Sequence, residues 1–524
     1  MSAPIQRQGR SFLYLILIVS GILVLLSVGA IVFLPISLVN NPPEKSTAEG
    51  IGVIQEAGNE YIGISNGIYP FDTSRVDGDL KRQGSEKFKS GDKVGAQSLW
   101  LQAAAMDTSD AEVLIYLEDL RVASSGNYIT LIVGTMLTGD NSAIGAGRDS
   151  LQGAYIAQKE YNDGAKLGGG RLIRLLIANS GSKADYATIV AQKIVQQAKQ
   201  DKSTVGVMGW IYSSRTAKAI DVLSKARIPM VSSTASADEL TGISPFFFRV
   251  APSNKYQAIE GAKYVEQQLY ARRVALFLDP NDPYSNSLGR DFSRQFTADG
   301  YQIVDTENYT VGQKQALPAL LQKALNSKPD LIYFSGYSDD LSVLLINLPT
   351  SLPNLQVMGG DGLYGLNGYP PSARPGFSRL RFTAFFYPDE WDILGLGGQK
   401  PAFFTEYSSN FNPTGQQPPG KYGFTRADND VALAYDATTV LLKGCQNALD
   451  AGNTTVTPVA LQQGLTKITG DQAIQGVTGQ ISFGLDGDPV KKATVILYID
   501  PAGHFKMFGQ NGIQGCFQVG QTAC

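Results

Sequence analysis

The chain has 524 residues, which at roughly 100–200 residues per domain is enough for three or four folding units. Its 44 lysines and arginines against 47 aspartates and glutamates leave a net charge of −3, which argues against the basic face that nucleic-acid binding requires. A single histidine, His504, and three cysteines supply neither a zinc ligand set nor the usual general base. We therefore expect no metal site, no cofactor, no nucleic-acid partner and no catalytic residues.

The N-terminal stretch carries no charged residue between Arg10 and Glu44, and its apolar run over residues 12–39 exceeds the roughly 20 residues that span a bilayer. The run is too long for a secretory h-region, so residues 1–40 are predicted to be a cytoplasmic tail and an uncleaved transmembrane anchor, with a cleaved signal peptide as the alternative. Arg7 and Arg10 precede the helix, and the positive-inside rule then keeps the N-terminus in the cytoplasm and the main domain outside. The prediction is a single-pass protein of the cell membrane.

Residues 41–126 are predicted to form a spacer followed by a small helical segment. Pro42 and Pro43 fix φ and stop the membrane helix, and helical periodicity then extends over residues 79–124. The pattern resembles one tetratricopeptide unit plus the first helix of a second, fewer than the three repeats that such arrays usually need. We expect this segment to pack on another structure. A partner-docking module and an ordinary helical hairpin both remain open.

From Tyr128 onward, β-rich runs alternate with amphipathic helical patterns. The strand-like runs are YITLIVGTM, RLIRLLIANS, TVGVMGW, IPMVSS, RRVALFLDP, YQIVDTENY, PDLIYFSGY and NLQVMGGDG, and the first helical stretches between them cover residues 149–162, 184–200 and 216–226. Such alternation predicts βαβ units, a parallel sheet and helices on both of its faces. Some 400 residues of this pattern exceed one comfortable core, so two lobes are expected. Their ligand should bind at the carboxyl ends of the strands.

Several motifs in this region resemble, in order, those of the branched-chain amino acid binding proteins, the type I periplasmic-binding proteins of ABC transporters. They are GTMLTGDNSAIGAGRDSLQGAYIAQKEYN, WIYSSRTAKAIDVLSKARIPMVSSTASADEL, FFFRVAPSNKYQA, DPNDPYSNSLGRDF, IYFSGYSDDLSVLL, VMGGDGLYG, AYDATTVLLKG and ISFGLDGDP. The resemblance covers residues 128–507 and implies an α/β clamshell of two doubly wound parallel-sheet lobes, preceded by the transmembrane helix and the small helical segment.

The resemblance also implies how the chain divides between the lobes. It assigns residues 127–249 plus 385–489 to lobe 1 and residues 250–384 plus 490–524 to lobe 2. The three hinge crossings are predicted near Val250, near Ala384 and near Pro489.

Two serine- and threonine-rich loops supply candidate donors for a ligand carboxylate. Ser213 precedes one predicted helix, and Thr234, Ala235 and Ser236 precede the next. Hydroxyl and backbone N–H groups at a helix N-terminus bind a carboxylate without a formal cation. In the family the matching positions hold the α-carboxylate and α-amine of the ligand. The alternative is that these residues only cap their helices.

The glycine-rich loop VMGGDGLYG carries Asp361, which matches the acidic residue that binds the ligand's α-ammonium in the family. A charge-assisted hydrogen bond there would reject ligands that lack the amine. Asp361 stands where the branched-chain binders have glutamate, so the ligand's position or identity can differ, and a plain turn-capping role is the alternative. Tyr284 matches the aromatic residue that closes over the ligand, and Tyr337 is a weaker match on the opposite strand end. The expected pocket border consists of Asn141, Ile144, Trp210 and Tyr212.

The cysteines give a weak indication of compartment. Cys516 and Cys524 lie close together near the C-terminus and can pair in an oxidising environment, which would leave Cys445 alone. Three unpaired thiols are the alternative.

The function predicted from these features is an extracytoplasmic protein that captures a small solute, an amino acid above all, between two lobes for an ABC-type importer and its permease. The alternative is a membrane-tethered sensor of amino acids, amides or aromatic acids that signals to a partner through residues 44–125. An enzyme is disfavoured because the chain has no G-x-S-x-G elbow, no P-loop and no H-E-x-x-H motif.

Overall fold

The computed structural model describes residues 51–56, 58, 60–365, 368–412, 427–500, 504–509 and 513–521. The chain divides into two units, Met1–Glu44 and Lys45–Cys524, and every described residue belongs to the second. The membrane anchor predicted at residues 12–39 lies outside the described residues. Within the described ranges, none of the helices has both the length and the hydropathy needed to cross a bilayer.

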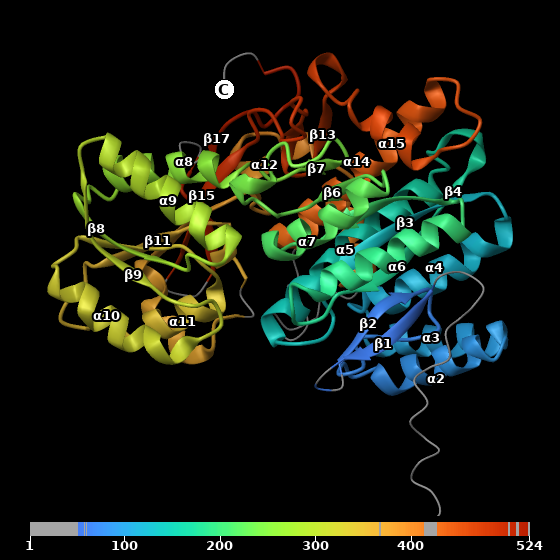
Figure 1. Cartoon of the computed structure of the whole chain (residues 1–524), viewed down its shortest axis with the longest axis horizontal. Coiled ribbons are helices and arrows are strands. Elements are labelled where there is room, and N and C mark those ends of the chain that lie inside the picture. The colour runs from blue at the N-terminus through green and yellow to red at the C-terminus, as the bar shows by residue number, and fades with distance from the viewer. Residues whose placement is uncertain are drawn as a thin grey trace, which may run out of the picture. The chain divides into compact units, whose positions relative to one another are not determined.

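The first sheet has seven strands in the order β1-β2-β4-β3-β5-β6-β7 (Figure 1). Its members are β1 (Gly52–Glu56), β2 (Glu60–Ser65), β3 (Tyr128–Thr135), β4 (Leu172–Asn179), β5 (Thr204–Gly209), β6 (Met230–Ser232) and β7 (Phe247–Arg249). The strands from β4 to β7 are parallel. Their central strands are almost wholly buried apolar runs, as expected of a sheet covered on both faces. The helices that belong with this sheet are α5 (Asn141–Asp163), α6 (Tyr186–Gln200), α7 (Ser213–Lys225), α13 (Phe403–Phe411), α14 (Asn429–Asp450) and α15 (Pro458–Leu465). The short helix α12 (Glu390–Ile393) instead packs its Trp391 against Ala493 and Phe517.

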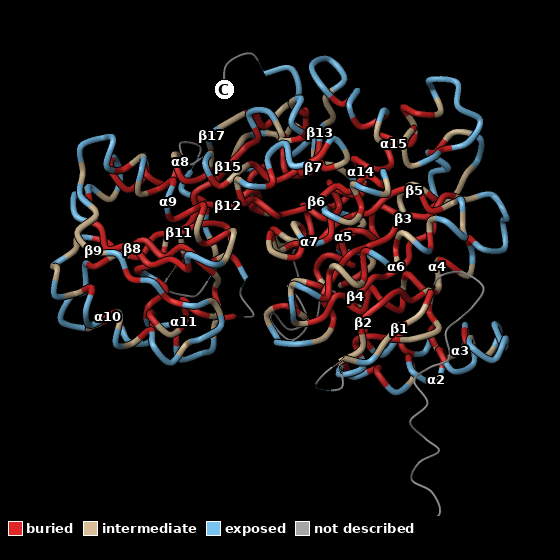
Figure 2. The backbone as a smooth tube through the Cα atoms, viewed as in Figure 1, coloured by how far each residue is buried: buried red, intermediate tan, exposed pale blue. Residues whose placement is uncertain are grey.

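The second sheet runs in the order β16-β15-β12-β11-β10-β8-β9, with β17 paired to β15. Its strands are β8 (Arg273–Leu278), β9 (Gln302–Asn308), β10 (Leu331–Phe334), β11 (Gln356–Gly359), β12 (Leu380–Ala384), β15 (Thr494–Ile499), β16 (Phe505–Met507) and β17 (Ile513–Gln514). The helices packed with it are α8 (Asn254–Gln267), α9 (Pro283–Ala298), α10 (Leu317–Asn326) and α11 (Ser338–Asn347). A hairpin of β13 (Ile474–Gly476) and β14 (Gly479–Ile481) stands apart from both sheets. Figure 2 shows the buried residues concentrated along the strands of both sheets.

The α/β class agrees with the prediction, but the expectation of purely parallel sheets is wrong at the edges. Strand β2 pairs antiparallel with β1 and with β4, and β15 pairs antiparallel with β12, β16 and β17. Antiparallel neighbours arise where the chain reverses through a short connection instead of a helical crossover. The pairs β1–β2 and β15–β16 are joined in this way.

The segment before Tyr128 differs from the expected spacer, because β1 and β2 extend the first sheet. Three helices follow, α2 (Gly78–Lys89), α3 (Lys93–Met106) and α4 (Ala111–Ser125), in the region where helical periodicity was predicted. Helix α4 packs against β4 and α5. Val53, Phe71, Trp100 and Tyr116 are buried in the same hydrophobic core as residues of β3 and α14. The helical segment therefore completes the core of the first sheet.

The chain passes between the two sheets more than once. It enters the second sheet after β7, returns after β12 and enters again at β15. The exact lobe boundaries and hinge positions stay predictions. Cys516 takes part in a disulfide, and Cys445 is a buried free thiol, so three unpaired cysteines are ruled out. Cys524 lies outside the described residues.

Candidate ligand-binding site

A cavity of about 60 Å³ lies where the carboxyl ends of strands from both sheets meet. Its walls come from α5, from the segments after β5 and β6, from the segments after β8, β10 and β11, and from the start of α14. The lining residues are Ser142, Ala146, Asp149, Ile211, Tyr212, Ser213, Thr234, Tyr284, Tyr337, Ser338, Asp361, Gly362, Tyr364, Gly365, Asp428, Asn429 and Asp430.

On the side of the first sheet, Ser213 is the first residue of α7. The N–H groups of a helix's first turn have no intrahelical acceptor, and the helix dipole makes this end attractive to an anion. The Ser213 hydroxyl accepts a hydrogen bond from the Ala237 N–H at 3.1 Å, which leaves its own proton available. The Thr234 hydroxyl donates to the Ile211 carbonyl at 3.0 Å. These contacts fasten the two loops together and present the α7 N-terminus to the cavity.

On the side of the second sheet, Asp361 follows β11 and opens a short 3₁₀ turn. Its Oδ1 accepts hydrogen bonds from Gln257 Nε2 and from the Tyr284 hydroxyl, both at 2.9 Å. Burial raises the pKa of Asp361 to about 6, against the lowering effect of the hydrogen bonds from Gln257 and Tyr284. At neutral pH the group is mostly a carboxylate that can accept from an ammonium.

Three tyrosine rings contact one another in a row beside Asp361. The rings of Tyr284 and Tyr337 are stacked with centroids 5.2 Å apart, and the Tyr212 ring is tilted against Tyr337 with centroids 5.1 Å apart. Tyr212 follows β5 of the first sheet, whereas Tyr337 follows β10 of the second, so the row joins the two. Burial raises the pKa of all three phenols, which keeps them neutral. A neutral aromatic wall next to a carboxylate suits a small cation.

Comparison with known proteins decides the family. The family described as periplasmic binding protein matches residues 132–500. This chain belongs to that family.

Relatives and solved structures agree with this assignment. The Leu/Ile/Val-binding protein BraC3 of Rhizobium johnstonii is 30% identical over 240 residues, which cover 45% of this chain and 62% of that protein. The fold is similar to that of the branched-chain amino acid transporter substrate-binding protein LivJ of Streptococcus pneumoniae in complex with isoleucine, with a TM-score of 0.62, 21% identity and coverage of 73% of this chain and 100% of that one. It is also similar to an R. palustris solute-binding protein in complex with benzoate, with a TM-score of 0.60, 15% identity and coverage of 76% and 99%. The chain covers less than two thirds of the first curated relatives it matches.

The cavity of this periplasmic binding protein brings together most, but not all, of the residues predicted for the site. Five of the predicted ligand residues line it, together with one residue of the predicted border. These six are Ser213, Thr234, Tyr284, Tyr337, Asp361 and Tyr212. Their roles toward a ligand stay predictions.

The other predicted residues do not line the cavity. Asn141 and Ile144 lie in the first turn of α5, because that helix begins at Asn141 and not at the expected Asp149. Trp210 is fully buried beneath the site, and its Nε1 donates to the Ser180 hydroxyl at 2.8 Å.

The loop after β6 also turns part of its length away from the cavity. The Ala235 N–H donates to the Ser232 hydroxyl at 3.2 Å. Ser236 is buried, and its carbonyl accepts from the Asn254 N–H at 2.7 Å.

Sequence reasoning missed three carboxylates that line the cavity, those of Asp149, Asp428 and Asp430. Asp428 is the N-cap of α14 and accepts from the N–H groups of Asp430 and Val431, both at 3.1 Å. An acidic residue just before a helical pattern is a recognisable capping signal, so the start of α14 could have been predicted from the sequence. Asp149 lies far away in the sequence, and no local pattern links it to α14.

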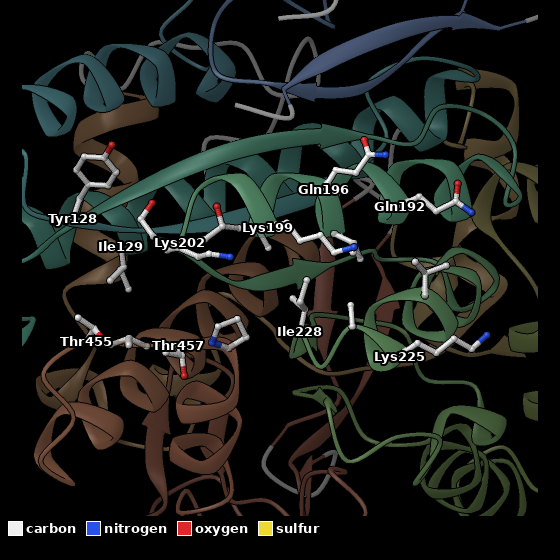
Figure 3. A pocket seen from close by; sticks show the side chains of 18 of the residues that line it. Tyr128, Ile129, Gln192, Gln196, Lys199, Lys202, Lys225, Ile228, Thr455 and Thr457 are labelled. Atoms are coloured by element: carbon white, nitrogen blue, oxygen red, sulfur yellow. The ribbon is translucent and has the colours of Figure 1, made fainter. Parts of the chain in front are cut away.

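A much larger hollow of about 1290 Å³ lies at the opposite ends of the strands in the first sheet (Figure 3). It is lined by residues at the starts of β3 and β5, such as Tyr128 and Thr204, and by Lys199, Lys202 and Lys225. Those three lysines are exposed. The ligand sites of open α/β sheets lie at the carboxyl ends of strands, so the smaller cavity is the candidate site.

Proposed function

We propose that this protein captures an α-amino acid between two lobes outside the cytoplasm and delivers it to an ABC-type importer. The observation that carries the proposal is the pairing, across one small cavity, of the α7 N-terminus with the Asp361 carboxylate. An α-amino acid carries an anion and a cation on one carbon, so these two groups complement it. The names of the relatives, which are Leu/Ile/Val-binding proteins, support the same ligand class.

The ligand's α-carboxylate would meet the first turn of α7 and the hydroxyls of Ser213 and Thr234. Its α-ammonium would donate to Asp361, and Tyr284 and Tyr337 would cover it. Asp361 is already held by Gln257 and Tyr284, so its carboxylate loses little freedom when the ligand binds. The ligand then joins groups that belong to different sheets.

Closure of the two lobes follows from this bridging. Lobe 1 would comprise residues 127–249 plus 385–489 and lobe 2 residues 250–384 plus 490–524, with crossings near Val250, Ala384 and Pro489. A ligand favours the closed form only by its differential affinity for that form. Because the α7 N-terminus and Asp361 lie on different sheets, only a closed cleft lets both bind one amino acid.

The N-terminal region would tether the protein to the membrane. The apolar run over residues 12–39 is long enough to span a bilayer, with the N-terminus in the cytoplasm. The importer's permease would then lie in the same membrane. A sensor would use the same cleft but a different partner, docked on residues 44–125.

The proposal is tested by isothermal titration calorimetry of the full chain with L-leucine, L-alanine and L-norvaline, and with benzoate as the amine-free comparison. We expect one or more amino acids to bind and Asp361→Asn to weaken them about 10- to 100-fold, because a hydrogen bond to a charged group is worth roughly 1.5–3 kcal/mol. Asp340→Asn is the matched control. Its carboxylate also lies with the second sheet and accepts from the Gly312 N–H, but it does not line the cavity.

Two results would contradict the proposal. One is unchanged affinity in Asp361→Asn, and the other is benzoate binding as tight as that of every amino acid. Uptake by cells that depend on the protein separates transport from sensing, since an importer's binding protein is required for uptake.

A further inference from the structure

The side chain of Gln257 lies behind the cavity wall and uses every hydrogen bond that it can make. Gln257 lies near the start of α8, is fully buried and does not line the cavity. Its Nε2 donates to Asp361 Oδ1 at 2.9 Å and to Asn254 Oδ1 at 2.7 Å. Its Oε1 accepts from the Asp361 N–H at 3.3 Å and from the Thr383 hydroxyl at 2.8 Å. A primary amide has two donor protons and two acceptor lone pairs, so these four contacts fix its orientation.

Both ends of this amide contact Asp361. The Asp361 carboxylate needs a donor and the Asp361 N–H needs an acceptor, and Gln257 supplies the two from one rigid plane. A glutamate in place of Gln257 would accept from the N–H but repel the carboxylate, and a lysine would leave the N–H without an acceptor. The amide therefore holds the backbone and the side chain of Asp361 in one fixed relation.

The other two contacts of the amide reach the proposed crossings between the sheets. Thr383 is fully buried in β12, beside the crossing near Ala384. Asn254 is the first residue of α8, shortly after the crossing near Val250. The Asn254 N–H donates to the Ser236 carbonyl, in the loop after β6 of the first sheet, at 2.7 Å. Gln257 therefore joins Asp361 to segments at two crossings.

The glycine before Asp361 leaves room for this network. A Cβ at Gly360 would lie 2.6 Å from the Tyr284 hydroxyl and 3.1 Å from Gln257 Oε1. The φ of Gly360 is −101°, which other residues adopt freely, so space and not backbone conformation requires the glycine. Tyr284 and Gln257 are the two side chains that donate to the Asp361 carboxylate. The glycine-rich loop thus lets both donors approach Asp361 closely.

We propose that Thr383 and Gln257 are positioning residues for ligand recognition, with Thr383 orienting the Gln257 amide and the amide aiming the Asp361 carboxylate at the ligand's ammonium. The proposal rests on the proposed function, because Asp361 is taken to hold that ammonium. It places part of the ligand affinity in two buried residues that line no part of the cavity. It also makes the direction of the Asp361 carboxylate depend on the backbone beside the crossing near Ala384.

The first test is isothermal titration calorimetry of the full chain with L-leucine, L-alanine and L-norvaline. Thr383→Val has nearly the shape of threonine but no hydroxyl, and we expect it to weaken binding about three- to tenfold, since a neutral hydrogen bond is worth roughly 0.5–1.5 kcal/mol. Thr383→Ser restores the hydroxyl and should bind within about twofold of the parent. Thr494→Val is the matched control. Thr494 is buried on the neighbouring strand β15, its hydroxyl has no hydrogen-bond partner among the described residues, and its loss should leave affinity unchanged.

A double-mutant cycle separates positioning from general damage to the fold. Asp361→Asn removes the charge that Thr383 and Gln257 are proposed to aim, so adding Thr383→Val to it should weaken binding by less than about twofold further. A merely structural effect of Thr383→Val would weaken both backgrounds equally. Gln257→Met keeps the side-chain length but removes both its donor and its acceptor, and it should weaken the parent at least tenfold. It provides the same cycle if Thr383→Val does not fold, as urea unfolding of each variant shows.

Three results would overturn the positioning role and leave the proposed function standing. They are Thr383→Val binding as tightly as the parent, Thr383→Ser binding as weakly as Thr383→Val, and additive effects in the cycle. If the parent binds none of the three amino acids, the proposed function fails and the positioning role fails with it.

Discussion

At the scale of single residues, Asp361 shows how burial and hydrogen bonding compete. Removal from water disfavours its carboxylate, and the donors Gln257 and Tyr284 recover only part of that loss, so its pKa lies near 6. The folded protein therefore binds the Asp361 proton more tightly than the unfolded chain does. Its contribution to stability falls as pH rises through the window between about 4 and about 6.

The raised pKa of Asp361 predicts that the melting temperature of the empty protein and its affinity for an amino acid change in opposite directions with pH. The melting temperature of the empty protein should decrease less steeply between pH 4 and pH 6 in Asp361→Asn than in the parent, because the substituted side chain does not titrate. Amino acid affinity of the parent should fall as pH drops below about 6, because a protonated Asp361 no longer attracts an ammonium. Calorimetric titrations at pH 5 and pH 7.5 check this trend, and an equal pH dependence in Asp361→Asn would contradict it.

At the scale of elements, the sequence was most informative where periodicity was strong. The alternation after Tyr128 predicted the parallel strands and their helices, because buried strands and amphipathic helices impose different apolar patterns. The start of α5 was predicted at Asp149, too late by two turns, because the helix begins at Asn141 and includes Gly145 and Gly147. In the structure, a Cβ at Gly147 would collide with the Met136 carbonyl, so that glycine permits close helix–strand packing.

The candidate site was predictable only in part, because some of its residues follow a local sequence pattern and others are brought in by the tertiary fold. Ser213, Thr234 and Asp361 follow strands, and that position is visible in the sequence. Asp149 reaches Asp428 across a large sequence separation, and only the tertiary fold brings them together. The edge strand β1 was missed because five residues that begin with a glycine and end with an acid carry little periodicity.

The N-terminal helices are held by buried charges as well as by apolar packing. Lys81 of α2 is fully buried, and its Nζ lies 2.5 Å from Asp110 Oδ2 and 2.9 Å from Glu112 Oε2 at the start of α4. Glu112 in turn accepts from the N–H groups of Phe71 and Asp72. One lysine therefore connects α2 to α4 and, through Glu112, to the segment that follows β2.

Substitution Lys81→Met should lower the free energy of unfolding by about 3–5 kcal/mol, because it leaves Glu112 buried without its cation and Asp110 with only Arg75, whose Nε lies 3.6 Å away. Urea unfolding of the full chain measures this loss. Arg82→Met is a matched control, since Arg82 is the next residue of α2 but pairs with Asp79 and Glu86 on the exposed face. We expect little change there, because exposed ion pairs contribute little. Equal stability of the two variants would contradict a structural role for Lys81.

At the scale of the whole Lys45–Cys524 unit, one ion pair ties two of the proposed crossings together. Arg249, at the end of β7, is fully buried, and its Nε and one terminal nitrogen bind the two oxygens of Asp488, each at 2.6 Å. The other terminal nitrogen donates to the carbonyls of Ala235 and Ala237, at 3.2 and 2.8 Å. The pair therefore links the crossings near Val250 and Pro489 to a loop that borders the ligand cavity.

Substitution Asp488→Asn keeps the shape of the side chain but removes its charge, and it should lower the free energy of unfolding by about 2–3 kcal/mol. Because Arg249 also positions Ala235 and Ala237, ligand affinity should fall although Asp488 does not line the cavity. A saturating amino acid should stabilise the parent by about 2.7 kcal/mol at 100 times its dissociation constant, and the same concentration should stabilise the variant less. Urea unfolding with and without the amino acid measures both effects, and Asp486→Asn, on the same loop, is the control. If Asp488→Asn unfolds and responds to ligand as the parent does, the crossings are held by backbone contacts alone, such as the hydrogen bond from the Arg249 N–H to the Gly487 carbonyl.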